Sequence, residues 1–522
     1  TLQVARLLLD AGHADSALAE TQRIDSIVSA LNLPREAIRA RVIRGTALVR
    51  LGEVDAGVRT LDGALATAER HPSPDILVEA HEALGEAFAA TGRDDSALHE
   101  FDLAALAVEH STLDLTLDLD RAGYRDRNLR PYDGALRLLL RASSRPGATD
   151  ELVRWLSRRN AAALALGAGG SAAARSRGPA VPGLDDLRSR LRDDEVLLAY
   201  VVLDSTVSGV AVTRSGARAA RLPIDAPGLA ARIDAIRRPL VTTFSGRLDL
   251  ARAHYAAGPA AELYAALIEP FVHEIAGKRR LLIAPDGALH ALSFDGLVAP
   301  DGAYLIDAFE TEYLPSPAFL PAPEERQRAQ RLNALRLLAV GYGAPGSEAE
   351  VRALRDVWPH GRIVVLDSSG ATTSAVKKRM TAFGILHFAV HATADTHDPL
   401  MSHLTLVADS LDDGLFHTAD IAAARTNAAL VVLSACETDA GPIFGGEGAM
   451  GIARAFLAGG ARAVVATQWP VGAETATLMR EFYARLARGE APATALRAAK
   501  LMMRRSAGGG HPVYWAGFEL VR

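Results

Sequence analysis

The sequence predicts an α-helical repeat solenoid followed by an α/β domain, in which a mostly parallel sheet is flanked by helices. Two observations lead to this division. Through residues 1–165, apolar residues recur at helical spacing, and similar segments align at steps of 40 residues. After residue 183, short and fully apolar stretches, typical of buried parallel strands, are separated by helical segments.

Each repeat is predicted to contain a helix, a turn with glycine and aspartate, and a second helix. The small or apolar residues that match at this step are Gly12, Gly52 and Gly92, then Ala17, Gly57 and Ala97, then Leu18, Val58 and Leu98, and also Gly45 and Gly85. A looser fourth copy is LRPYDGALRLLLRAS. The pattern resembles the tetratricopeptide repeat, and longer helices would explain a period above the usual length of about 34 residues. Such solenoids commonly bind peptides, so we expect a regulatory protein or peptide partner here. A helical scaffold without a specific ligand is the alternative.

The remaining chain divides at changes of composition. Residues 166–183 are rich in glycine, alanine, serine and proline, which predicts a flexible linker. Residues 184–330 are expected to form a half-domain related to residues 331–522, but without its reactive residues. The segments predicted as strands include EVLLAYVVLD, RLLIAPDG, LRLLAVGYG, GRIVVLD, GILHFAVHA, AALVVLSAC and ARAVVATQWPV.

Charge and cysteine content exclude several classes of function. The net charge is −5, which provides no positive field for nucleic acid or for an anionic membrane. A single cysteine cannot form an internal disulfide or a cysteine-rich zinc site. No apolar stretch reaches the length of a membrane span, and the first 16 residues turn polar too early for a secretory leader. We therefore expect a cytoplasmic protein with no metal, cofactor, direct nucleic-acid partner or membrane contact.

One glycine-rich loop offers a competing interpretation. Gly341, Gly343 and Gly346 have the spacing of a dinucleotide-binding turn, and Asp367 follows the next predicted strand. Asp367 lies 26 residues after Gly341, however, and Pro345 stiffens the turn. A nucleotide-dependent enzyme is therefore the weaker alternative.

The only cysteine, Cys436, follows one predicted strand, and His391 follows another. If these strands are neighbours in a parallel sheet, both side chains lie at the same edge, where a thiolate and an imidazole could cleave an amide bond. The backbone N–H groups of Ala392 and Cys436 are candidate oxyanion donors, because both are expected where the strand ladder stops. His387 competes with His391 but lies inside its apolar run. The alternative is that Cys436 is a buried, unreactive residue without a catalytic role.

Residues 184–522 resemble the CHAT family of caspase-like domains, which are related to caspases and separase and often follow tetratricopeptide repeats. The matching segments are LLIAPDGALHALSFDGL, EAEVRALRDVWPHGRIVVLDSSGATTSAV, ILHFAVHA, LVVLSACET, GGEGAMGIARAFLAGGARAVVATQWPV and HPVYWAGFEL. This resemblance implies a cysteine endopeptidase of protein substrates, with Cys436 as nucleophile and His391 as general acid and base. Ala392 stands where the family often has glycine. A catalytically inactive scaffold is the rival hypothesis, and His290 is expected to be structural.

Carboxylates surround both reactive positions in the sequence. They are Asp395, Asp398, Glu437, Asp439 and Glu447. A partly desolvated carboxylate can bind a guanidinium through two hydrogen bonds, so we expect a preference for Arg or Lys immediately before the scissile bond. Solvated loop charges are the alternative.

Overall fold

The computed structural model describes residues 1–31, 33–70, 73–114, 123–125, 127–142, 145, 147–165, 181–242, 255–323, 332–395, 399–434, 443–444, 448–449, 451–469, 472, 474–506 and 509–522. These residues form two compact units, Thr1–Trp155 and Leu156–Arg522. Among the described helices, none combines the length and the apolar composition needed to cross a bilayer.

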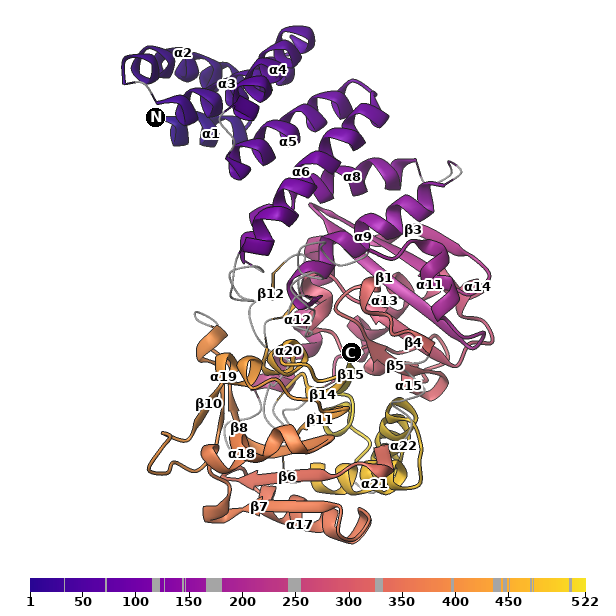
Figure 1. The fold of residues 1–522 in the computed structure, drawn as a ribbon. Helices are drawn as coiled ribbons and strands as arrows, with labels where there is room; N and C mark the ends of the chain where they lie inside the picture. Colours follow the sequence, from indigo (N-terminus) through magenta and orange to yellow (C-terminus); the bar gives the residue numbers. More distant parts are fainter. Residues whose placement is uncertain are drawn as a thin grey trace. The chain divides into compact units, whose positions relative to one another are not determined.

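The first unit is built of paired antiparallel helices, shown in indigo and purple in Figure 1. Its helices are α1 (Leu2–Asp10), α2 (Ala14–Ala30), α3 (Pro34–Arg50), α4 (Val54–Arg70), α5 (Pro74–Ala90), α6 (Asp94–Asp114), α8 (Arg130–Arg141) and the first part of α9 (Ala148–Ala165). The helices α3, α4 and α5 have 17 residues each. Helices of this length account for the period of 40 residues, as the sequence predicts. The aligned glycines Gly12, Gly52 and Gly92 end the first helix of each pair with positive φ angles of 83°, 88° and 71°.

Glycines in the middle of the repeat helices let neighbouring helices approach closely. A Cβ atom on Gly45 would lie 2.6 Å from the Leu61 side chain, and one on Gly85 would lie 2.6 Å from the ring of Phe101. The aligned glycines Gly45 and Gly85 are therefore sites of helix contact, which explains why they recur at the repeat spacing.

Among its described residues, the second unit forms a sheet of 13 strands. The strands are β1 (Glu195–Leu203), β2 (Thr206–Val212), β3 (Ala217–Asp225), β4 (Arg280–Ala284), β5 (Glu310–Tyr313), β6 (Leu337–Tyr342), β7 (Ile363–Asp367), β8 (Ile385–Thr393), β9 (His403–Thr405), β10 (Leu415–His417), β11 (Leu430–Leu433), β14 (Val464–Thr467) and β15 (Phe518–Val521). The main order is β10-β9-β8-β11-β14-β15-β5-β4-β1-β2-β3, with β6 beside β8 and β7 beside β6. A separate two-stranded ribbon pairs β12 (Ile443–Phe444) with β13 (Gly448–Ala449).

Helices cover both faces of this sheet. The described helices are the end of α9, α11 (Leu184–Arg190), α12 (Ala226–Thr242), α13 (Ala257–Leu267), α14 (Val272–Ile275), α15 (Leu305–Ala308), α17 (Ser347–Val357), α18 (Thr373–Arg379), α19 (Thr418–Ala423), α20 (Ile452–Ala458), α21 (Thr475–Ala487) and α22 (Pro492–Arg505). Around β8 the apolar core forms two clusters, one with α17, α21 and α22 and the other with α18, α19 and α20. Alternate residues of β8 belong to different clusters, with Ile385 and Ala389 on the α17 side and Leu386 and Phe388 on the other.

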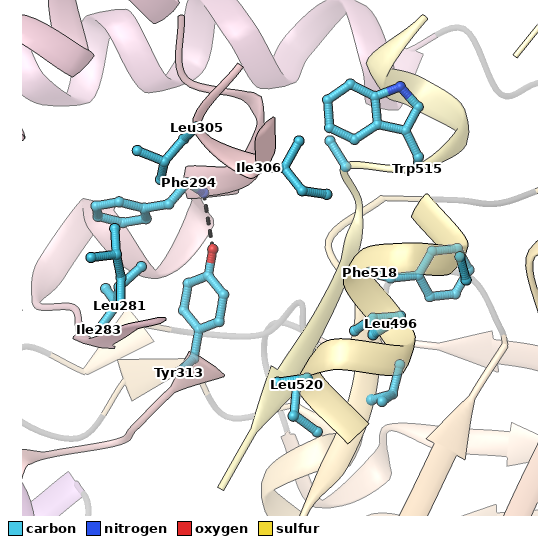
Figure 2. Close-up of a cluster of buried hydrophobic side chains, with 14 of the residues drawn as sticks. Leu281, Ile283, Phe294, Leu305, Ile306, Tyr313, Leu496, Trp515, Phe518 and Leu520 are labelled. Carbon is cyan, nitrogen blue, oxygen red and sulfur yellow. Dashed lines mark hydrogen bonds between the residues drawn. The ribbon is translucent and has the colours of Figure 1, made fainter. Parts of the chain in front are cut away.

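The two halves of the second unit share a core, part of which is shown in Figure 2. Leu281 and Tyr313 come from the first half, whereas Leu496 and Leu520 come from the second, and all are at most 4% exposed. The Tyr313 hydroxyl accepts a hydrogen bond of 2.9 Å from the backbone N–H of Phe294. The strand β15 completes this connection because it pairs with β14 on one side and with β5 on the other.

The last part of α9 is anchored in the second unit. The Arg159 guanidinium lies 2.7 Å from Asp286 Oδ1, and both side chains are at most 4% exposed. The other oxygen of Asp286 accepts a hydrogen bond of 2.7 Å from the backbone N–H of Val202. The first compact unit thus ends at Trp155, ten residues before the boundary drawn from the sequence. Most of the predicted linker, residues 166–183, lies outside the described residues.

Candidate active site

The strands that precede the two candidate catalytic residues are neighbours and run parallel. The register pairs Leu430 with Ile385 and continues to Leu433 opposite Phe388. Ser434 extends the ladder by donating its N–H to the carbonyl of Phe388 at 2.8 Å. This confirms the expected adjacency of the two strands.

Cys436 itself lies outside the described residues. In the sequence it stands three positions after Leu433, and His391 stands three positions after the registered partner Phe388. Each candidate residue therefore comes three positions after its member of the same registered pair, Leu433 and Phe388, on two adjacent strands.

His391 is exposed, beside the glycine-rich loop that follows β6. Gly343 has a φ angle of +76°, and a Cβ atom there would lie 3.5 Å from Cδ2 of His391. Glycine is suited to this left-handed conformation and leaves the imidazole accessible. The loop that looks like a dinucleotide turn thus lies next to the candidate catalytic histidine.

The same loop has few features of a nucleotide site. Asp367, the candidate ribose-binding acid, is paired with Arg352 at 2.6 Å. Gly341 lies against α17, where a Cβ atom would be 2.7 Å from the Val351 side chain. Both residues therefore have local packing roles that explain their presence.

Ala392 is expected where the strand ladder stops; this holds for the pairing with β11, which ends at Phe388, but not for the opposite edge of β8. The strand β8 continues to Thr393, where it pairs with the antiparallel strand β9. The register places His391 opposite Thr405 and Ala392 opposite Leu404. The short strand β9 has only three residues, so the apolar pattern did not predict it.

His387, the competing histidine, is fully buried below this edge. Its Nδ1 lies 3.2 Å from the Tyr483 hydroxyl, and its Nε2 lies 3.0 Å from Oε1 of Glu350. Burial, together with the nearby Glu350 carboxylate, raises the pKa of Tyr483 well above its usual value. His387 therefore belongs to a buried polar group, whereas His391 is exposed to solvent.

Of the five carboxylates proposed for substrate binding, the structure describes Asp395 alone. It is half-buried, and its backbone N–H donates to the Ser402 hydroxyl at 2.9 Å. The others, Asp398, Glu437, Asp439 and Glu447, lie outside the described residues.

Within the described part of the chain, no group of three or more His, Cys, Asp or Glu side chains is arranged to hold a metal ion. His290, expected to be structural, is half-buried in the short 3-10 helix η2 (Gly287–Ala291). Its backbone carbonyl accepts a hydrogen bond of 2.9 Å from the Gln468 side chain.

Sequence reasoning missed Glu350 and Tyr483, which contact His387, and Thr475, which donates a hydrogen bond to Glu350. Glu350 lies in α17 near Glu348, and both look like ordinary solvent-facing acids of an amphipathic helix. Only the helical position of Glu350, one residue before the buried Val351 and four before Leu354, indicates that it is near the buried face.

The fold and this site define a class: a helical repeat region followed by a caspase-like α/β domain with a mixed sheet. A CHAT domain is matched over residues 257–522, about half of the chain. The chain belongs to the CHAT domain family.

Curated relatives support the pairing with repeats. The chain is 34% identical over 108 residues to the mouse (Mus musculus) protein named tetratricopeptide repeat protein 28. It is 32% identical over 112 residues to the human (Homo sapiens) protein of the same name. These segments cover 20% and 21% of this chain but 4% of each relative, so the chain matches a small part of those proteins.

Proposed function

We propose that this protein is a cysteine endopeptidase in which Cys436 and His391 form the catalytic dyad. The observation that carries the proposal is the parallel pairing of β8 with β11, after which His391 and Cys436 follow at equal distances in sequence. Membership of a caspase-like family agrees with this assignment.

In the proposed reaction, the Cys436 thiolate attacks the carbonyl carbon of the scissile amide. The negative oxygen that forms is to be stabilised by the backbone N–H groups of Ala392 and Cys436. His391 gives a proton to the departing amine as the C–N bond breaks, which leaves a thioester. His391 then takes a proton from water as the water attacks the thioester, and the C–S bond breaks to return the thiolate.

The test is proteomic cleavage mapping with the full chain and four variants. Cys436→Ala and His391→Ala are each expected to abolish cleavage, and the double variant is expected to be no worse than either, because the two residues act as a unit. His360→Ala, which removes an exposed histidine after α17, is the matched control and should keep full activity. If cleavage persists in Cys436→Ala, the assignment of the nucleophile is wrong, and if the unmodified chain adds no cleavage at all, the chain acts as a binding scaffold instead.

Substrate preference is a second part of the proposal. Asp395 follows β8 within four residues of His391 and is positioned by Ser402, so its carboxylate could bind an Arg or Lys side chain before the scissile bond. Fluorogenic peptides that differ only at that position provide the measurement. Preferred cleavage after Asp or Leu would contradict this preference without affecting the dyad.

The helical repeats are proposed to bind a regulatory protein or peptide rather than to supply catalytic groups. Removing residues 1–155 keeps Arg159, which pairs with Asp286, so it is a cleaner deletion than removal of residues 1–165. Cys436 in this shortened chain should still react with a small electrophile. Loss of that reaction in a folded protein would mean that the repeats complete the active site.

A further inference from the structure

A group of buried polar side chains lies between the two strands of the candidate dyad and the helices α17 and α21. Its members are Glu350 of α17, His387 of β8, Ser434 after β11 and Thr475 at the start of α21. Each is at most 7% exposed.

Glu350 is the centre of this group. Its Oε1 lies 3.0 Å from Nε2 of His387, within ion-pair distance although not aligned as a hydrogen bond. Its Oε2 accepts a hydrogen bond of 2.9 Å from the Thr475 hydroxyl. The Thr475 oxygen in turn accepts a long hydrogen bond of 3.5 Å from the Ser434 hydroxyl. One carboxylate thus connects, through Thr475, the two strands that lead to His391 and Cys436.

Packing alone does not account for these residues. The helices α17 and α21 that carry Glu350 and Thr475 also contribute Val351, Leu354, Leu478 and Met479 to the apolar core. A buried carboxylate loses its hydration and is expensive unless it is paired, and a well-packed apolar residue of similar volume is often as stabilising or more so. Polar groups at this position therefore suggest a requirement for a defined geometry.

The spacing along each strand shows what that geometry controls. His387 precedes His391 by four residues on β8, an even interval that places both on the face towards α17. Ser434 precedes Cys436 by two residues. The buried contacts thus fix each strand just before its candidate catalytic residue.

We propose that Glu350 and Thr475 are positioning residues, which hold the segment before Cys436 at a fixed place relative to the β8 strand of His391. This inference rests on the proposed function. A displacement of about 1 Å in a catalytic group can reduce the rate by about 100-fold, so a small relaxation of this segment has a large effect.

The central experiment compares Thr475→Val with Thr475→Ser in the full chain. Valine has nearly the shape of threonine but has no hydroxyl, so it removes the bonds to Glu350 and Ser434 and also the bond of 2.9 Å to the Gly472 carbonyl. Serine keeps the hydroxyl and is the conservative control. We expect Thr475→Val to lower kcat by about 10- to 100-fold with little change in KM, and Thr475→Ser to remain within a few-fold of the unmodified protein.

A second comparison uses two acids of α17. Glu350→Gln removes the buried charge that faces His387, whereas Glu348→Gln changes a side chain that is 38% exposed and pairs with Arg352. We expect only Glu350→Gln to lower kcat. If Glu350→Gln fails to fold, the Thr475 pair still decides the question.

A readout independent of peptidase activity separates this inference from the proposed function. Cys436 is the only cysteine of the 522 residues, so alkylation by iodoacetamide reports on it alone. A nearby imidazolium lowers the pKa of a thiol. We expect the midpoint of the pH dependence of alkylation to rise by about one pH unit in Thr475→Val and to stay unchanged in Thr475→Ser, because only the first variant loosens the segment.

The outcomes distinguish the two proposals. If Cys436→Ala abolishes cleavage but Thr475→Val keeps kcat and the alkylation profile, the peptidase assignment holds and the positioning role is wrong. If cleavage is independent of Cys436, the peptidase assignment fails, and the alkylation profile alone decides whether Glu350 and Thr475 position the thiol.

Discussion

Ion pairs occur in both compact units, but their surroundings differ. In the repeat unit, Arg35 of α3 pairs with Asp75 of α5, with side chains 55% and 40% exposed. In the second unit, Lys500 of α22 pairs with Asp295 at 2.5 Å, with side chains 2% and 3% exposed. In these two pairs, the same kind of contact is made in water in the repeat unit and inside the core in the second unit, which also has exposed pairs such as Arg238 with Asp234.

The difference indicates that the two units are stabilised in different ways. Exposed pairs contribute about 0–1 kcal/mol each, so the repeat unit depends on close contacts at small residues such as Gly85. A buried pair contributes little compared with apolar packing, but removal of one partner leaves an uncompensated charge in the core. The second unit should thus be far more sensitive to the loss of single charges.

The largest expected effect is that of Lys500→Met. This change leaves the Asp295 carboxylate buried without its cation and also removes the bond to the carbonyl of Phe518. Thr311 still donates to the carboxylate at 2.6 Å, but it carries no charge. We expect a loss of about 3–5 kcal/mol in the free energy of unfolding, measured by urea denaturation. A loss below about 1 kcal/mol would contradict the contrast between the units.

The pH dependence of the free energy of unfolding provides a second test, because it reports on the buried position of His290. Burial lowers its pKa to about 4, a shift that nearby Asp286 opposes and that the cations of Arg454 and Arg159 reinforce. The unfolded chain therefore binds a proton below about pH 6.5, whereas the folded chain does so only near pH 4, and stability is lost as the pH falls between these values.

We expect this histidine to account for at most about 3 kcal/mol of that loss. The variant His290→Gln should lack the contribution of this histidine to the loss of stability. The difference in unfolding free energy between the variant and the unmodified chain should therefore not be the same at pH 4 as at pH 7. Parallel curves for the two proteins over this range would show that the pKa of His290 is not lowered.

The stability of the repeat unit should be sensitive to side-chain volume at the helix contacts rather than to the loss of single charges. In Gly85→Ala the new Cβ would lie 2.6 Å from the Phe101 ring, and overpacking of this kind costs about 1–3 kcal/mol. Gly63→Ala is the matched control, because no heavy atom lies within 4 Å of its added Cβ. The control should stabilise α4 by up to about 1 kcal/mol. Thermal unfolding followed by circular dichroism measures both, and equal effects would remove the argument for close packing.

The smallest effect is expected for Arg35→Gln. The pair with Asp75 is solvated and Asp75 keeps Arg39 as a second partner, so the free energy of unfolding should change by less than about 0.5 kcal/mol. Added salt should reduce even this difference. A cost above about 1.5 kcal/mol would show that exposed pairs stabilise the repeats after all.

The sequence predicts most of this fold because its strongest patterns come from burial. The turn glycines of the repeats and the apolar runs of β1, β4, β6, β8, β11 and β14 are found where the sequence places them. Short strands that depend on distant partners are harder to predict. The strands β9 and β15 have three and four residues, too few for a clear period, and their antiparallel pairing is set by tertiary contacts.

The candidate site shows the same limit. The position of His391 near the edge followed from the end of an apolar run, but the depth of His387 did not, because a histidine inside such a run can face either polar partners or solvent. The partners of His387 come from α17 and α21, so they are recognised only when three distant segments are brought together.

The position of β15 has a consequence for synthesis of the protein. This strand lies in the middle of the sheet, between β14 and β5, although its residues are 518–521. Arg522, which directly follows it, pairs with Glu312, 210 residues earlier. A nascent chain on the ribosome therefore exposes the unpaired edges of β5 and β14 until residues 518–521 have been made. Such open edges invite pairing with other chains, so this unit should depend on chaperones during translation more than the repeats, whose contacts are made between neighbouring helices.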